Sequence, residues 1–306
     1  MRKLIAASCG AFMLCCVMLL SGCGASSDAS SSGGSGSAAA ASQDTGSAVP
    51  AGGLEETTPK EPKQPESALP KGDKYIAITF DDGPTGNEDG RTERLLDGLK
   101  ERGAHATFFL CGYRVKDFNS MMNRYLAEGH EVGNHTMDHK NLTTEVCDGG
   151  LQQVGSNNDL IQSYTGQKPT VMRPTGGACD AEVQAAMKQL GMPIIQWNLD
   201  TLDWKYRDAS AVKARIVEGA QDGSIVLEHD LYETTVEGVL AAIDELQPQG
   251  YAFVTVSELA KIKGVTLEPG VVYTDFTDET LHPEEAQTAT DSTAAQPVSG
   301  KTDTQS

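Results

Sequence analysis

Two adjacent carboxylates stand at the end of an apolar run in the first third of the chain. The run 76–80 leads directly into Asp81 and Asp82, which are followed by Gly83 and Pro84. Taken alone, this segment is typical of a solvated turn, because Asp, Gly and Pro are common turn residues. Two neighbouring acids also repel each other unless a cation separates them, so the same pair could serve a metal site.

Two histidines four residues apart, His135 and His139, could supply further metal ligands. On a helical turn this spacing brings both imidazoles to one face. With one of the aspartates they would form a triad of two histidines and one carboxylate that leaves coordination positions for water and substrate. Such a pair can also be two surface histidines in a polar loop. The acid pair and a third histidine, His229, favour the metal site.

The elements that must position these residues alternate between strand-like and helix-like runs, which is typical of α/β proteins. We expect strands at 75–80, 106–111, 131–134, 170–173, 193–197, 224–227 and 252–256, and helices at 87–102, 117–128, 144–164, 180–190, 209–220 and 234–246. About seven parallel strands fit an incomplete or distorted (β/α) barrel best. The acids and histidines above, together with Arg173, Asp203 and Trp204, all follow or end predicted strands, where α/β folds build active sites.

Five motifs resemble, in the same order, those of the polysaccharide deacetylases, also called NodB-homology proteins or carbohydrate esterase family four. They are Thr79-Phe80-Asp81-Asp82-Gly83, His135-Thr136-Met137-Asp138-His139, Arg173-Pro174-Thr175-Gly176-Gly177, Asp200-Thr201-Leu202-Asp203-Trp204 and Leu227-Glu228-His229. The segment 251–259 is similar to the closing segment of the family. The resemblance covers roughly Lys74 to Leu259 and implies the NodB-homology fold.

This resemblance implies a role for each site residue. It implies that Asp82, His135 and His139 bind a divalent metal, most often zinc, with cobalt or another divalent ion as alternatives. It implies that Asp81 is the general base, held by Arg173, and that His229 is the general acid, oriented by Asp203. Trp204 and Leu227 would line the pocket for the acetyl methyl group.

These residue types suit amide hydrolysis, which needs an activated water, a stabilised oxyanion and a proton for the departing amine. A nearby Arg173 would keep Asp81 ionised, and Asp203 beside His229 would favour the imidazolium. An Arg–Asp pair that is purely structural and a histidine that only caps a strand are the alternatives for these positions.

The third motif departs from the usual Arg-Pro-Pro-Tyr of the family, because Thr175 and Gly176 take its last two places. In relatives the backbone N–H of the Tyr position donates to the oxyanion, and Gly176 retains that N–H. The aromatic wall of the groove is lost, and Gly177 loosens the loop further. We expect this change to affect sugar preference and rate rather than reaction type.

The N-terminus resembles the signal peptide of a bacterial lipoprotein. Arg2 and Lys3 precede an apolar run that ends in Leu20-Ser21-Gly22-Cys23, which is similar to a lipobox. We expect residues 1–22 to be removed and Cys23 to be lipidated, which would anchor the protein at the extracytoplasmic face of a bacterial cell membrane. An ordinary signal peptide cleaved nearby is the alternative.

Composition divides the rest of the chain. Residues 23–70 are rich in Ser, Gly, Ala and Pro and are expected to form a flexible tether, and 71–263 form the expected catalytic domain. Residues 264–306 are expected to be an acidic, low-complexity and largely disordered tail. The pairing of Cys111, Cys147 and Cys179 stays open. A net charge of −19 argues against nucleic acid as a partner.

These observations favour a monomeric, lipid-anchored and metal-dependent enzyme that removes N-acetyl groups from GlcNAc residues of an extracellular polysaccharide. Peptidoglycan is the expected substrate, because the tether could reach a cell wall outside the membrane. A chitooligosaccharide deacetylase or an acetylxylan esterase would use the same machinery. A catalytically degenerate glycan-binding lipoprotein or a solute-binding lipoprotein would share the anchor, but neither would need all of the site residues.

Overall fold

The strand that carries the acid pair lies in the middle of the sheet. In the computed structural model, which describes residues 68–85 and 90–283, β1 (Lys74–Asp81) pairs in parallel with β2 (Thr107–Leu110) and with β6 (Ile225–His229). The first residues of β1 also pair with β7 (Tyr251–Phe253). Residues 76–81 are all buried, as expected for a continuous apolar run in a parallel sheet that is covered on both faces.

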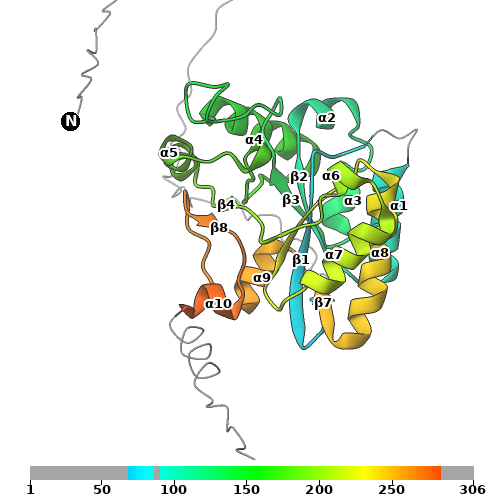
Figure 1. Ribbon diagram of the computed structural model, residues 1–306. Helices are drawn as coiled ribbons and strands as arrows, with labels where there is room; N and C mark the ends of the chain where they lie inside the picture. The colour runs from blue at the N-terminus through cyan, green and yellow to red at the C-terminus, as the bar shows by residue number, and fades with distance from the viewer. Residues whose placement is uncertain (1–67, 86–89, 284–306) are drawn as a thin grey trace, which may run out of the picture. The chain divides into compact units, whose positions relative to one another are not determined.

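Two further strands extend this sheet. β3 (Glu131–Asn134) pairs with β2, and β5 (Leu199–Asp200) pairs with β6, so that the order is β3-β2-β1-β6-β5 and every pairing is parallel. Figure 1 shows β1 running through the centre of the molecule with β7 at its lower end. The carboxyl ends of the strands therefore meet at the opposite, upper edge.

A second, smaller sheet continues the curvature beyond β3. It contains β4 (Ile194–Ile195) and β8 (Val272–Tyr273), and Met172 links it to the first sheet through single bridges to Asn134 and Ile194. The predicted strand at 170–173 is thus reduced to one bridging residue. In the described part of the chain no strand pairing joins β5 to the β4–β8 pair, so the sheet stays open. The predicted α/β fold with an incomplete barrel is confirmed.

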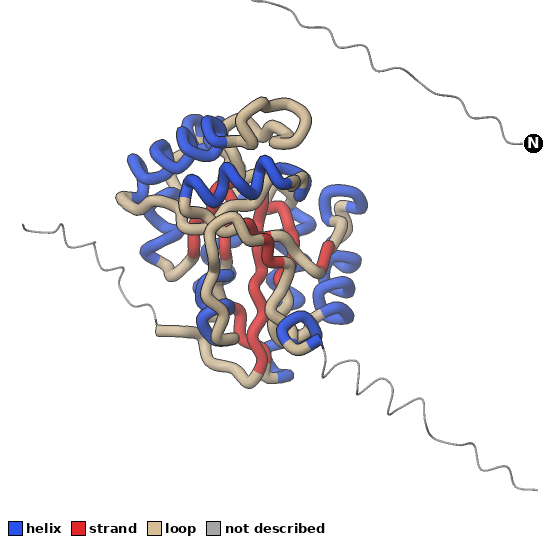
Figure 2. The backbone as a smooth tube through the Cα atoms, turned by 90° about the vertical axis from the view of Figure 1, so that its left-hand side faces the viewer, coloured by secondary structure: helices blue, strands red, loops and turns tan. Residues whose placement is uncertain are grey.

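Helices cover both sides of these strands, as Figure 2 shows. Their bounds are α1 (Arg91–Glu101), α2 (Gly112–Asp117), α3 (Met122–Ala127), α4 (Leu151–Thr165), α5 (Ala181–Leu190), α6 (Asp203–Tyr206), α7 (Ala209–Gly219), α8 (Glu233–Leu246), α9 (Val256–Ile262) and α10 (Asp278–Leu281). The largest core lies between β1 and the apolar faces of α1, α7 and α8. On α1 that face consists of Leu95, Leu96 and Leu99, whose spacing predicted it. None of the helices in the described ranges is long and apolar enough to cross a membrane.

Two helices differ from their predicted bounds. The helix expected at 117–128 is shorter, because α3 covers only 122–127 of it, and Asp117 instead ends α2, which begins at Gly112. The helix expected at 144–164 begins only at Leu151, because Gly149 and Gly150 have left-handed φ values of 58° and 91°. Such a backbone cannot continue a right-handed helix.

The chain remains ordered beyond Lys263, where the domain was expected to end. Val272 and Tyr273 form β8, and Phe276 is fully buried in a core cluster. Thr277 caps α10 by accepting a hydrogen bond from the Thr280 N–H. The predicted boundary at Lys263 is therefore wrong, because one buried aromatic residue and a short strand outweigh the polar composition around them.

Several predicted features lie outside the described residues. These are the signal peptide at 1–22, the lipidated Cys23, the tether up to residue 67 and the tail from residue 284.

Candidate active site

The acid pair is aimed by an unusual backbone conformation at the end of β1. Asp81 is the last residue of the strand and lies opposite His229 of β6. Asp82 follows with a φ of 71°, in the left-handed region that residues other than glycine seldom adopt. The Cys111 N–H at the end of β2 donates to the Gly83 carbonyl at 3.1 Å and fixes the turn. The ends of β2, β1 and β6 therefore meet at this turn.

Asp82, His135 and His139 form a cluster whose possible ligand atoms all lie within 4.8 Å of one another. The Nε2 atom of His139 is 2.9 Å from Asp82 Oδ1, and that of His135 is 3.3 Å from the same oxygen. The segment between the two histidines is a loop and not the expected helical turn. Thr136 and His139 have φ values of 70° and 54°. These two left-handed residues turn the backbone so that the two imidazoles come together.

Buried amides hold the histidine loop in place. Asn157 on α4 donates to the carbonyl oxygens of Leu110 at 2.9 Å and Thr136 at 3.0 Å. Asn134 Oδ1 accepts a hydrogen bond from the Thr136 N–H at 2.8 Å. These bonds stabilise the left-handed backbone at Thr136, which explains why the loop keeps its shape without regular secondary structure.

The donor set of the cluster fits a divalent transition metal. His135 Nδ1 lies 2.8 Å from the Arg173 carbonyl, which can only accept, so Nδ1 carries a proton and Nε2 is the nitrogen that faces Asp82. Asp82 Oδ1 is buried and accepts no hydrogen bond from the described residues. Burial alone would raise the pKa of Asp82, but the adjacent His135 and His139 outweigh burial and lower it well below its usual range. Two imidazole nitrogens and an ionised oxygen are ligands that zinc and cobalt accept.

Asp81 is held by a fully buried guanidinium. Arg173 Nη1 donates to Asp81 Oδ1 at 2.8 Å and to the Thr79 hydroxyl at 2.7 Å. Its other nitrogens donate to the carbonyl oxygens of Ile195 and Gln196. The second carboxylate oxygen, Asp81 Oδ2, is left 3.7 Å from His135 Nε2, on the side of the cluster. Arg173 thus orients one oxygen of Asp81 and leaves the other facing the cluster.

His229 forms the second charged pair, with Asp203. Its Nδ1 is 2.9 Å from Asp203 Oδ1, and its backbone N–H donates to Asp203 Oδ2 at 2.8 Å. The Thr235 hydroxyl donates to the same Oδ2, so the fully buried Asp203 is well satisfied. Burial lowers the pKa of His229, but the bond to Asp203 and its charge raise the pKa overall to about 9. The ring is therefore an imidazolium at neutral pH, with Nε2 as the remaining donor.

The three residues predicted for the substrate pocket lie at the same edge. Trp204 is 47% exposed at the start of α6, and Leu227 is buried two residues before His229 on β6. Gly176 has a φ of 61° within the short 3-10 turn at 175–177. The hydroxyls of Thr175 and Thr136 are 3.4 Å apart and connect this turn to the histidine loop. The structure brings Asp81, the cluster and His229 together at the carboxyl edge of the sheet, where these three residues also lie.

Sequence reasoning missed a buried network behind the acid pair. Asp230 is fully buried, and its Oδ2 accepts a hydrogen bond from the Thr92 hydroxyl on α1 at 2.5 Å. Thr92 in turn bonds Thr85 reciprocally, since the N–H of each donates to the hydroxyl of the other. Asp230 Oδ1 has no partner in the described chain, and burial raises the pKa of this carboxyl to about 6. The available signal was a second acid directly after His229.

The three cysteines left open by the sequence are all free thiols in the structure. Cys111 is buried and Cys147 is exposed. Cys179 is intermediate between them. None of the predicted site roles falls on these residues.

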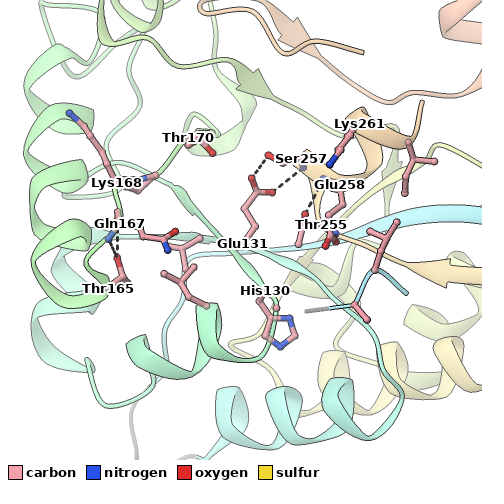
Figure 3. Close-up of a pocket in the computed structure, with 17 residues that line it drawn as sticks. His130, Glu131, Thr165, Gln167, Lys168, Thr170, Thr255, Ser257, Glu258 and Lys261 are labelled. Atoms are coloured by element: carbon pink, nitrogen blue, oxygen red, sulfur yellow. Dashed lines mark hydrogen bonds between the residues drawn. The ribbon is translucent and has the colours of Figure 1, made fainter. Parts of the chain in front are cut away.

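The structure also contains a cavity of about 960 Å³ at the opposite end of the strands. His130 and Glu131 line it from the beginning of β3, and Ser257 and Glu258 line it from α9 (Figure 3). The Ser257 hydroxyl bonds Glu131, so part of the polar lining is already satisfied. None of the predicted site residues lines this cavity, and the candidate active site therefore remains the carboxyl edge of the sheet.

Comparison with known proteins agrees with this geometry. The family model described as "Polysaccharide deacetylase" matches residues 68–195. Peptidoglycan-N-acetylglucosamine deacetylase PgdA of Listeria monocytogenes is 40% identical over 223 residues, which is 73% of this chain and 46% of that protein. Peptidoglycan-N-acetylmuramic acid deacetylase PdaC of Bacillus subtilis is 38% identical over 210 residues, which is 67% of this chain and 44% of PdaC. The chain thus spans slightly less than half the length of these relatives.

Solved structures show the same similarity. The structure of PdaC from Bacillus subtilis matches with a TM-score of 0.59 and 38% identity, over 62% of this chain and 92% of that one. A family 4 acetyl xylan esterase from Clostridium thermocellum, in complex with a cobalt ion, matches with a TM-score of 0.60 and 30% identity, over 66% of this chain and 98% of that one. The chain belongs to the polysaccharide deacetylase family, the NodB-homology proteins of carbohydrate esterase family four.

Proposed function

We propose that this protein is a metal-dependent hydrolase that removes N-acetyl groups from GlcNAc residues of peptidoglycan. One observation carries the proposal. The Asp82–His135–His139 cluster lies beside Asp81, a carboxylate held by a buried guanidinium, and Asp81 lies opposite His229, an imidazolium held by a buried carboxylate. This arrangement supplies a base and an acid at the same strand ends as a three-ligand site. The names of the relatives support peptidoglycan as the substrate.

Asp82, His135 and His139 would hold the metal ion. When bound, the cation supplies Lewis-acid chemistry, lowering the pKa of a water molecule and polarising an acetyl carbonyl. Zinc is the metal we propose, and cobalt is the alternative, because both accept two imidazoles and one carboxylate. With only three protein ligands, the site would leave room for water and the acetyl group.

Asp81 acts as the general base. Its Oδ2 faces the cluster and takes a proton from the attacking water, while Arg173, which also donates to the Thr79 hydroxyl, holds Oδ1 in place. The water oxygen bonds to the acetyl carbon, and the bond between that carbon and the sugar nitrogen breaks. The oxyanion that forms lies within reach of a backbone N–H donor, a role that we assign to Gly176.

His229 acts as the general acid. Its Nδ1 is engaged by Asp203, so the proton on Nε2 is the one available for the departing nitrogen. The products are acetate and the free amino sugar, and Asp81 then loses the proton that it took from water. Trp204 and Leu227 are proposed to line the pocket for the acetyl methyl group.

The location that we propose rests on the sequence outside the described residues. The lipobox-like Leu20-Ser21-Gly22-Cys23 supports lipidation of Cys23 and anchoring at the outer face of a bacterial cell membrane. The Ser/Gly-rich residues that follow would let the domain reach the cell wall. We propose that the protein acts there as a monomer.

Acetylxylan esterase is the second candidate activity, because a structural neighbour carries that name and the glycines at 176 and 177 remove an aromatic wall from the groove. The test is acetate release by the full chain loaded with zinc or cobalt, from peptidoglycan, an N-acetylglucosamine oligomer and acetylxylan. Asp81→Asn is the control that should retain the metal without turnover. Acetate released mainly from acetylxylan would favour the second candidate. Metal-loaded protein that releases no acetate from any of the three would instead indicate a glycan-binding protein.

A further inference from the structure

Three basic side chains stack on tyrosine rings beside the candidate active site. The Arg207 guanidinium lies 4.3 Å over the ring of Tyr232. The Lys205 ammonium and the Arg215 guanidinium lie 5.1 Å and 5.3 Å from the ring of Tyr206, which is 51% exposed. The chain as a whole has 43 acidic and 24 basic residues, so three cations that each lie over a tyrosine ring contrast with its net charge of −19. We call Lys205, Arg207 and Arg215 the basic patch.

The basic patch is built onto the acid side of the active site. Arg207 caps the C-terminus of α6, the helix that begins with Asp203, and the Arg207 N–H donates to the Asp203 carbonyl at 3.0 Å. Arg207 Nε donates to the Trp204 carbonyl at 3.4 Å. The ring of Tyr232 lies 6.5 Å from the ring of His229. The Arg207 guanidinium therefore contacts Tyr232, which in turn lies next to the proposed general acid His229. Figure 1 shows α6 near the upper, carboxyl edge of the sheet.

The charge of the basic patch is not neutralised within the described residues. The ion pairs formed there include none of its three cations. Asp208, next to Arg207, caps α7 by accepting from the Ala211 N–H, and Glu233, next to Tyr232, pairs with Arg94. Arg207 is thus held by its stack and its backbone bond, and its two terminal nitrogens donate to none of the residues at 68–85 and 90–283.

We infer that Arg207, with Lys205 and Arg215 beside it, is a subsite for a carboxylate on the sugar strand whose acetamido group lies at His229. A guanidinium recognises a carboxylate through two parallel hydrogen bonds, and its stack on Tyr232 orders it before the ligand arrives. Muramic acid carries a free lactyl carboxylate on peptidoglycan strands from which the stem peptides have been removed, whereas chitooligosaccharides and acetylxylan are neutral. The inference rests on the proposed deacetylase function and names its substrate class as anionic amino-sugar strands.

Three tetrasaccharides test this subsite with the full, metal-loaded chain. One alternates N-acetylglucosamine with N-acetylmuramic acid and has free lactyl carboxylates, the second is the methyl ester of the first, and the third is the neutral N-acetylglucosamine tetramer. For Arg207→Gln we expect KM on the carboxylate substrate to rise about tenfold with kcat unchanged. KM on the ester and on the neutral tetramer should stay at the wild-type value. Arg207→Lys keeps the positive charge but loses the planar guanidinium that can form two parallel hydrogen bonds to a carboxylate. We therefore expect about a threefold rise in KM on the carboxylate substrate.

Arg102→Gln is the matched control, because Arg102 lies at the far end of α1 from the acid pair and binds Asp244. It should not change KM on any of the three substrates. The inference is overturned if Arg207→Gln changes KM equally on all three substrates, or leaves KM on the carboxylate substrate unaltered. If the wild-type chain releases no acetate from any of them with metal bound, the proposed function fails and the subsite fails with it.

Discussion

Arg173 contacts both halves of the candidate site, since its guanidinium holds Asp81 at 2.8 Å while its carbonyl oxygen lies 2.8 Å from His135 Nδ1. One residue thus orients the proposed base through its side chain and a proposed metal ligand through its backbone. The two contacts can be separated by mutation, because only the first depends on the side chain.

Arg173→Lys should therefore abolish most of the turnover and leave the metal in place. A lysine ammonium cannot reproduce the guanidinium hydrogen bonds to Asp81, Ile195 and Gln196. Each buried acceptor left without a donor costs about 1–3 kcal/mol of stability. The carbonyl that orients His135 remains. Metal content after dialysis, acetate release and thermal unfolding measure the three effects. Loss of the metal in this variant would show that the side chain also supports the cluster.

The two acids of the pair should differ sharply when each is replaced. Asp82→Ala removes one of three proposed ligands and should lose zinc, whereas Asp81→Asn should keep zinc and lose turnover. Calorimetric titration with zinc and acetate release measure these outcomes. Near-normal turnover of Asp81→Asn would show that another group is the base.

His229 should make both stability and activity depend on pH. Its pKa is raised from 6.5 to about 9, so its pairing with Asp203 stabilises the metal-free fold fully below pH 6.5. This contribution, about 3 kcal/mol, should be lost as the pH rises through 9. Asp203→Asn should lower the pKa of His229, so the pH above which kcat falls should also become lower. Unfolding in urea and an NMR titration of His229 in the wild type and the variant test this, and an unchanged titration would contradict it.

Much of the site could be predicted because its residues sit at strand ends in a parallel sheet. That topology alone brings Asp81 opposite His229, which are far apart in the sequence. The backbone that aims the side chains could not be predicted in this way. The positive φ values at Asp82 and His139 are stabilised by contacts from distant elements, such as the bond from the Cys111 N–H to Gly83. Composition and spacing carry no information on such contacts.

The same limit explains the error at the C-terminal boundary. The segment after Lys263 is polar on average, and its order depends on where single residues such as Phe276 are placed. The Gly223 carbonyl accepts a hydrogen bond from the Phe276 N–H at 2.8 Å. These two residues are far apart in the sequence, so no local sequence pattern predicts their contact. A compositional argument averages over such residues and therefore places the boundary too early.

Thr92 should support the metal site from behind the acid pair. Thr92→Val removes the hydroxyl that donates to Asp230 and accepts from the Thr85 N–H, leaving buried groups unsatisfied at a cost of about 1–3 kcal/mol each. The turn that carries Asp82 should loosen, and we expect zinc affinity to fall about tenfold. Thr92→Ser keeps the hydroxyl and is the control. A variant that loses stability but binds zinc as the wild type does would limit Thr92 to a structural role.

Phe276 should contribute to stability as a core residue, although it lies beyond the predicted end of the domain. Its ring is fully buried against a cluster that includes Ala77 and Ile225, so Phe276→Ala should lower the free energy of unfolding by about 3–5 kcal/mol. Val271→Ala is the matched control, because Val271 is 40% exposed and close in sequence. Its effect should stay within about 0.5 kcal/mol. Urea unfolding of the full chain measures both variants. Equal urea midpoints for the two variants would show that the segment after Lys263 does not belong to the cooperative fold. A lower midpoint for Phe276→Ala would place the end of the catalytic domain at Phe276 or beyond.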